Sequence, residues 1–252
     1  MAEAQFQILS DLHLESPAAY DVFHIDPKAP YLALIGDIGY VKDDGFFHFL
    51  RCQLEVFRIV FLSRIKRFEN GLGESCERSK RLGQLVFLDQ TRYDVSPTLS
   101  VLGCTLFSKV TQTQMESVSF GLNDFYHIQD WSVEAHQEAH RADLEWLNQE
   151  INSISRLEPD RKVVVFTHYC PSVHDNVVDP KRGHTKISSG FMTDLSDECC
   201  WKREVVKVWA FGHTHFNCDF RDVERETRVV SNQRGYYFSQ AEGFDISKVI
   251  KI

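Results

Sequence analysis

Several features that would assign this chain to particular protein classes are missing from its sequence. It has no apolar run of about 20 residues, the length that a membrane-spanning helix needs. Its first residues lack the basic and apolar regions of a signal peptide. It has no N-x-S/T glycosylation site and no C-x-x-C pair, and its seven cysteines are scattered. We therefore expect a reduced, cytoplasmic protein that does not associate with membranes.

The charge and size of the chain restrict its class further. With 28 basic and 36 acidic residues, the formal net charge is -8 at pH 7, which disfavours nucleic acid as a partner. The 252 residues, 43% of them hydrophobic, are enough for one domain with a large core. No internal repeat or low-complexity linker divides them, so we expect a single domain over residues 1–252, with its oligomeric state open.

Two apolar runs near the N-terminus are each followed at once by an acidic residue. Residues 6–9 predict a buried strand, which is followed by Asp11 and His13, and residues 31–35 predict a second strand, which is followed by Asp37. On extended backbone, Asp11 and His13 would point to the same side, because they are two residues apart. Such a pair suits a metal chelate or an acid/base pair, although a polar strand end is the more common reason for a lone D-x-H triplet.

Two later strands end in histidines. Residues 162–166 predict a strand followed by His168, and residues 205–211 predict a strand followed by His213 and His215. In open α/β sheets, sites gather beyond the carboxyl ends of the strands. Two carboxylates and four imidazoles that meet there are a natural ligand set for transition metals.

The remaining pattern predicts a pair of sheets with helices outside. Helical spacing covers residues 44–57, and a second helix starts with Ser132 as its N-cap and runs to about Arg156. Long connections are expected over 111–130 and 172–197. Further strands are expected at residues 58–62, 85–88, 100–107, 218–222, 228–231 and 248–252.

The ordered series D-L-H, G-D, T-H-Y and G-H-T-H, each closing a strand, resembles the calcineurin-like metallophosphoesterases, and their small fungal and bacterial members above all. The stretches His136 to Leu147 and Ser231 to Tyr236 also fit that type. The resemblance covers nearly the whole chain. It implies an α/β fold of two facing mixed β-sheets flanked by helices, a four-layer sandwich. It also implies a metal-dependent hydrolase that acts on a small phosphate ester.

The resemblance further implies two divalent metal ions, with Mn, Fe or Zn as the expected elements. Asp37 would bridge the two ions, because a carboxylate has two oxygens to offer and a neutral imidazole has one free nitrogen. The expected ligands are Asp11, His13, Asp37 and His215 for one ion and Asp37, His168 and His213 for the other.

The chain departs from the family at one motif. The family carries G-N-H-E/D at the end of its third strand, whereas here the strand over 58–62 is followed directly by a predicted short helix over 63–69, which Asn70-Gly71 ends. The resemblance gives the missing Asn as a ligand of the second metal and the missing His as a proton donor or phosphate contact. We do not expect Asn70 to replace either of them.

This departure leaves two functions open. One is a phosphomonoesterase or phosphodiesterase with a weakened second metal site, impaired because the loss of an acid catalyst typically costs about 10²–10⁴ in rate. The other is a non-catalytic metal-binding or interaction protein that keeps the fold. A missing exon or a splice variant would explain the departure, and so would an evolved pseudoenzyme.

Other polar residues have less specific signals. His136 and His140 are spaced like a zinc pair, but no third ligand is near in sequence, so we expect them to face solvent or pack on the core. His184 fits an exposed loop better than a phosphate contact. Arg234 fits a substrate contact and a structural ion pair equally well.

Overall fold

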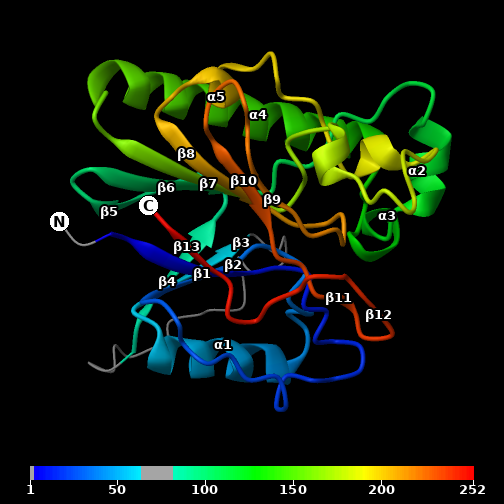
Figure 1. Cartoon of the computed structure of the whole chain (residues 1–252). Helices are drawn as coiled ribbons and strands as arrows, with labels where there is room; N and C mark the ends of the chain where they lie inside the picture. The colour runs from blue at the N-terminus through cyan, green and yellow to red at the C-terminus, as the bar shows by residue number, and fades with distance from the viewer. Residues whose placement is uncertain (1–2, 64–81) are drawn as a thin grey trace.

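The structure is a computed structural model that describes residues 3–63 and 82–252, and its strands form two large sheets stacked face to face (Figure 1). In the first sheet, β1 to β4 run parallel and the edge strand β13 is antiparallel to β1. The spatial order is β13 (Val249–Lys251), β1 (Gln5–Leu9), β2 (Tyr31–Leu34), β3 (Ile59–Ser63) and β4 (Gln84–Leu88).

The second sheet is also mixed, with four parallel strands between two antiparallel edge strands. Its spatial order is β5 (Thr91–Ser96), β6 (Leu99–Cys104), β7 (Lys162–Thr167), β8 (Val206–Phe211), β10 (Arg228–Ser231) and β9 (Asp219–Arg221). A separate hairpin pairs β11 (Gly235–Tyr236) with β12 (Ser239–Gln240).

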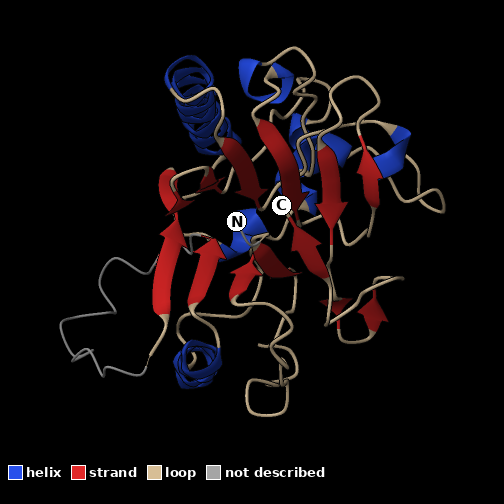
Figure 2. Cartoon of the chain, turned by 60° about the vertical axis from the view of Figure 1, so that its left-hand side comes forward, coloured by secondary structure: helices blue, strands red, loops and turns tan. Residues whose placement is uncertain are grey.

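Two long helices cover the outer faces of the sheets. The helix α1 (Asp44–Val56) lies against the first sheet and α4 (Val133–Leu157) against the second, as the turned view in Figure 2 also shows. Within residues 3–63 and 82–252, no helix has the length and apolar character that a membrane span needs. The shorter helices are α2 (Met115–Gly121), α3 (Asp124–His127), α5 (Cys199–Lys202) and the 3-10 turns Asp175–Val177 and Ser188–Gly190.

An apolar core joins the facing sides of the two sheets. At its centre the ring of Phe6 lies 6.0 Å from that of Phe61 and 5.8 Å from that of Phe166, so side chains of both sheets interlock. Alternate residues of each strand point into this layer, because successive side chains of a strand face opposite sides of the sheet. Burial on both faces explains why the strands are nearly continuous apolar runs.

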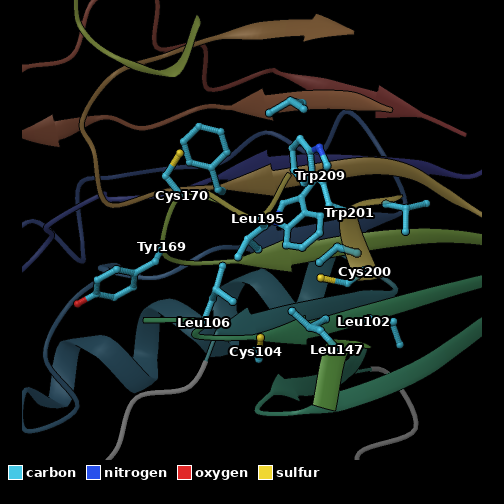
Figure 3. Close-up of a cluster of buried hydrophobic side chains, with 14 of the residues drawn as sticks. Leu102, Cys104, Leu106, Leu147, Tyr169, Cys170, Leu195, Cys200, Trp201 and Trp209 are labelled. Carbon is cyan, nitrogen blue, oxygen red and sulfur yellow. The ribbon is translucent and has the colours of Figure 1, made fainter. Parts of the chain in front are cut away.

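Each outer face has its own core beneath a helix. Under α4, Leu147 packs with Trp201 and Trp209 in the cluster that Figure 3 shows. Under α1, Phe46 and Phe49 pack against the first sheet. The protein therefore has four layers, in the order helix, sheet, sheet, helix, and the predicted fold class is confirmed.

Some sequence predictions were wrong in detail. Strand β5 was missed, because its sequence TRYDVS is polar and half-exposed at the edge of the sheet. The long connection expected over 111–130 contains α2 and α3, and the strand expected to reach Phe107 ends at Cys104. The short helix expected after β3 and its stop at Asn70-Gly71 fall within residues 64–81, outside the described part of the chain.

We expect Leu147→Ala to lower the free energy of unfolding by about 2–5 kcal/mol, because it opens a cavity under α4. Leu157, the last residue of the same helix, is 75% exposed and provides the matched control, expected to stay within about 0.5 kcal/mol of wild type. Urea denaturation followed by circular dichroism measures both variants. Equal losses for the two would contradict the packing of α4 on the second sheet.

Candidate metal centre

The six side chains that the sequence singled out as ligands meet where the carboxyl ends of both sheets come together. They form two groups, and within each group the potential ligand atoms lie within 4.8 Å of one another. The groups match the sets that the sequence predicted for two metals, apart from the bridging role of Asp37. The first group is Asp11, His13 and His215, and the second is Asp37, His168 and His213.

The first group is compact and its side chains are oriented by neighbours. His215 Nε2 lies 3.3 Å from Asp11 Oδ1 and 3.2 Å from His13 Nε2. His13 Nδ1 donates a hydrogen bond to Glu15 Oε1 at 3.0 Å, which leaves its Nε2 free to face the group. A carboxylate behind a histidine in this way fixes the tautomer and raises the basicity of the facing nitrogen.

Asp37 lies between the two groups. Its Oδ2 is 3.8 Å from His13 Nε2 and 3.6 Å from His168 Nε2. Its side chain keeps 44% of its surface exposed, whereas those of His13 and His168 keep 8% and 9%. One carboxylate oxygen therefore faces ligand nitrogens of both groups from the open side of the centre, which is the position that a bridging ligand takes.

The histidines of the second group are held in fixed orientations. His168 Nδ1 donates to the backbone oxygen of Ile35 at 3.0 Å, across the two sheets, so its Nε2 faces Asp37. The ring of His213 packs against the rings of Tyr169, at 4.1 Å, and Phe191, at 4.7 Å. Its Nε2 is buried and has no hydrogen-bond partner among the described residues.

Five of the six candidate ligands have left-handed backbone, with φ between 46° and 70°, and His168 is the exception. The sequence prediction that Asp11 and His13 share a side of extended backbone is therefore wrong, since their φ values are 53° and 46°. They still meet in one group, because a tight turn brings them together. Non-glycine residues in this region are strained and gather at functional sites.

Two glycines leave the room that the centre needs. A Cβ atom on Gly36 would lie 2.2 Å from His168 Nδ1, and one on Gly212 would lie 2.1 Å from Ser10 Oγ and 2.6 Å from Asp11 Oδ2. Both distances are far below van der Waals contact. The turns of the two sheets can therefore approach each other closely only because these positions have no side chain.

The carboxylates of the centre favour positive charge. Burial alone would lower the pKa of His168, but the neighbouring Asp37 raises it to about 10. Burial and the positive charge of His168 lower the pKa of His213 to about 3. Desolvation opposes the ionisation of Asp37, yet attraction to His168 lowers the pKa of this carboxyl. The pocket thus provides the electrostatic setting that a divalent cation requires.

These residues fit a pair of divalent metal ions. Imidazole nitrogens and carboxylate oxygens are the donors that Mn, Fe and Zn accept. The buried Nε2 of His213 gives independent support, because a buried nitrogen without a partner is costly unless it coordinates something.

The environment of the centre includes contacts that the sequence did not reveal. Tyr169 Oη donates to Asp124 of α3 at 2.5 Å, and Figure 3 shows this hydroxyl pointing away from the core. Asn123 Nδ2 donates to Tyr236 Oη at 3.0 Å, and the Tyr236 ring lies 4.3 Å from that of His13. Both contacts are long-range, and no spacing in the sequence could have signalled them.

The other candidate residues lie outside the centre. His136 and His140 pack in the core as expected: Ser108 N donates to His136 Nε2 at 3.1 Å, and His140 Nδ1 donates to the oxygen of Leu106 at 2.8 Å. His184 is exposed, as predicted. Arg234 forms no ion pair with any described residue, and its Nη1 donates to the backbone oxygen of Leu12.

Comparison with known proteins establishes the fold. The phosphopantetheinyl hydrolase of Mycobacterium tuberculosis superimposes with a TM-score of 0.64 at 14% identity, over 100% of this chain and 96% of that one. A dimetal phosphatase from Danio rerio aligns with a TM-score of 0.44 at 12% identity, over 91% and 87% of the two chains, which is too distant to support an inference. The chain therefore shares the two-sheet fold of this phosphopantetheinyl hydrolase.

Sequence comparison adds a viral relative. An uncharacterized protein of Acanthamoeba polyphaga mimivirus is 24% identical over 266 residues, which are 90% of this chain and 90% of that protein. No protein-family model matches the chain.

We expect Gly212→Ala to weaken metal binding by about 10–100-fold, the loss typical when the support of a ligand is disturbed, because its methyl group displaces Ser10 and Asp11. Gly183→Ala is the control, since nothing lies within 4 Å of a Cβ atom there and the strain of its left-handed backbone, with φ at 60°, falls on an exposed loop. Titration calorimetry with Mn²⁺ measures both variants. Unchanged affinity in Gly212→Ala would show that Asp11 tolerates displacement and does not hold the metal.

Proposed function

We propose that this chain, which has the calcineurin-like metallophosphoesterase fold, is a metal-dependent hydrolase of a small phosphate ester. The observation that carries the proposal is the position of Asp37, whose Oδ2 faces His13 Nε2 at 3.8 Å and His168 Nε2 at 3.6 Å. In this proposal Asp37 joins the first group as a fourth ligand and bridges to the second. Each group supplies both carboxylate and imidazole ligands, which suits two cations held close together.

The charge of the centre suits an anionic substrate. Two divalent cations against the carboxylates of Asp11 and Asp37 leave a net charge of about +2, which attracts a phosphate ester. When bound, such a pair of cations supplies Lewis acidity to the phosphoryl oxygens and makes a water molecule more acidic.

The described residues have distinct roles in this proposal. Glu15 keeps a proton on Nδ1 of His13, and the oxygen of Ile35 does the same for His168, so that each Nε2 remains free to bind a metal. Asp11 accepts hydrogen bonds from Ser10 Oγ at 2.5 Å and from the backbone N–H of His213, which fixes its carboxylate. The half-exposed Asp37 marks the side from which a substrate enters.

The missing Asn-His motif sets the expected rate. Strand β3 ends at Ser63, and no Asn-His pair follows it anywhere in the sequence. The second site then has three protein ligands, Asp37, His168 and His213, and the leaving group lacks the family's proton donor. We propose weak second-site binding and slow turnover. The same departure favours the alternative of a non-catalytic metal-binding protein that keeps the fold.

Hydrolysis of p-nitrophenyl phosphate and of bis-p-nitrophenyl phosphate with Mn²⁺, Fe²⁺ or Zn²⁺ tests the proposal and separates monoesterase from diesterase activity. We expect metal-stimulated turnover that EDTA abolishes. Asp37→Asn should lower it by more than about 100-fold, beyond the loss typical of residues that only orient ligands. Asp197→Asn, whose side chain is 100% exposed, should leave it unchanged. Two bound metals without any turnover would support the non-catalytic alternative.

Insertion of a G-N-H-E segment after β3 tests the cause of slow turnover. We expect the insertion to raise the rate by about 10²–10⁴-fold, the usual contribution of a general acid, and to tighten the second metal site. An insertion of the same length that carries Ala in place of Asn and His is the control. Full activity of the unaltered chain, with no gain from the insertion, would refute the impaired state.

A further inference from the structure

A segment after β10, residues 232–235, is bonded to the turn that carries Asp11 and His13. Ser10 N donates to the oxygen of Asn232 at 3.0 Å, and Arg234 N donates back to the oxygen of Ser10 at 3.1 Å. Gly235 N then donates to the oxygen of Asp11 at 3.0 Å. This segment, which we call the brace, is therefore hydrogen-bonded along the turn that carries Asp11 and His13.

The side chain of Arg234 extends this contact by one more residue. Its Nη1 donates to the oxygen of Leu12 at 3.0 Å, between the two left-handed residues Asp11 and His13. The residue is only 9% exposed, and its guanidinium lies over the ring of Phe23 at 4.9 Å. Among the described residues no carboxylate lies within ion-pair distance of it. A buried charge without a counterion is costly, so its contact with the turn needs a functional reason.

The same brace holds the other turn of the first metal group. The fully buried side chain of Gln233 accepts the backbone N–H of His215 on Oε1 at 2.6 Å. Its Nε2 donates to Thr214 Oγ1 at 3.0 Å and to the oxygen of Phe216 at 2.9 Å. All the hydrogen-bonding groups of this amide are therefore directed at the turn that carries His215.

The second metal group depends on other contacts. His168 is held by the oxygen of Ile35, and His213 by the rings of Tyr169 and Phe191. No hydrogen bond of the Gln233 or Arg234 side chain reaches Asp37 or His168 in the described residues. Loss of the brace should thus affect the two groups unequally.

We infer that Gln233 and Arg234 are positioning residues for the first metal, because together they fix the two turns that supply Asp11, His13 and His215. The inference rests on the proposed function for the identity of the ligand. Removal of either side chain should lower affinity at the first site and spare the second.

The test replaces the polar groups and keeps the volume, in Gln233→Leu and Arg234→Met. Arg234→Lys keeps one donor for the oxygen of Leu12 and should restore most of the affinity. The controls are Gln240→Leu, on the exposed hairpin, and Arg228→Met, which removes a surface pair with Asp219. Unfolding in urea identifies any variant that fails to fold, and the other member of the pair Gln233→Leu and Arg234→Met then carries the test.

Titration calorimetry and electron paramagnetic resonance with Mn²⁺ supply the first readout. We expect first-site affinity to fall by about 10–100-fold in Gln233→Leu and Arg234→Met, while the second site stays within error. At a Mn²⁺ concentration that fills both sites of the wild-type chain, the exchange-coupled signal of a metal pair should give way in the two variants to the six-line signal of a single ion. Equal losses at both sites, or none, would overturn the inference while leaving the proposed hydrolase intact.

Hydrogen exchange of the metal-free proteins supplies the second readout, which does not depend on metal. Amides of residues 10–15 and 213–216 should exchange faster in Gln233→Leu and Arg234→Met than in the two controls. Should the wild-type chain bind no Mn²⁺, the proposed function fails, yet this readout still decides whether the brace holds the turns. Unchanged exchange in both variants would refute the positioning role.

Discussion

The candidate metal centre depends on hydrogen bonds between the backbone turns that carry its candidate ligands. Asp11 N donates to the oxygen of Gly36 at 3.0 Å, and His13 N donates to the oxygen of Asp37 at 2.9 Å. The carboxylate of Asp11 in turn accepts the backbone N–H of His213. Each left-handed residue costs about 1–3 kcal/mol, so none of these turns would keep its shape alone. The stacking of the two sheets is what brings them close enough to stabilise one another.

The α3 region is also bonded to residues beside the candidate metal centre. Tyr169 follows His168 directly and bonds to Asp124, whereas Tyr236 lies on His13 and bonds to Asn123. Adjacent residues of α3 and its N-cap are therefore tied to both metal groups. Burial, and next the charge of Asp37, raise the pKa of Asp124. The carboxyl of Asp124 belongs to the electrostatics of the centre although it lies in neither group.

The sequence predicted the positions of the ligands better than the geometry that unites them. Polar residues at the carboxyl ends of apolar runs are a local signal, and parallel strands carry such ends to one edge, so the sequence could single out the six candidate ligands that the fold brings together. The extended backbone expected at Asp11 and His13 was wrong, because these left-handed residues donate hydrogen bonds to the backbone oxygens of Gly36 and Asp37, which are distant in sequence.

The contacts that could not be predicted from the sequence join residues that are far apart along the chain. The bond of Tyr169 to Asp124 spans 45 residues and that of Asn123 to Tyr236 spans 113. Only the fold brings such residues together, and neither apolar periodicity nor motif spacing predicts these contacts. Strand β5 was missed for a different reason, since an edge strand buries too little to show an apolar pattern.

The aromatic packing around His213 has a consequence for how a metal ion would enter and leave the centre. The rings of Tyr169, at 4.1 Å, and Phe191, at 4.7 Å, pack against the buried imidazole and restrict its rotation about its χ angles. Its coordinating direction is thus fixed by apolar packing, and not by whatever it binds. A metal ion that binds here would not have to wait for the His213 side chain to change its rotamer. The rate at which the ion binds should therefore be governed by loss of its own hydration water.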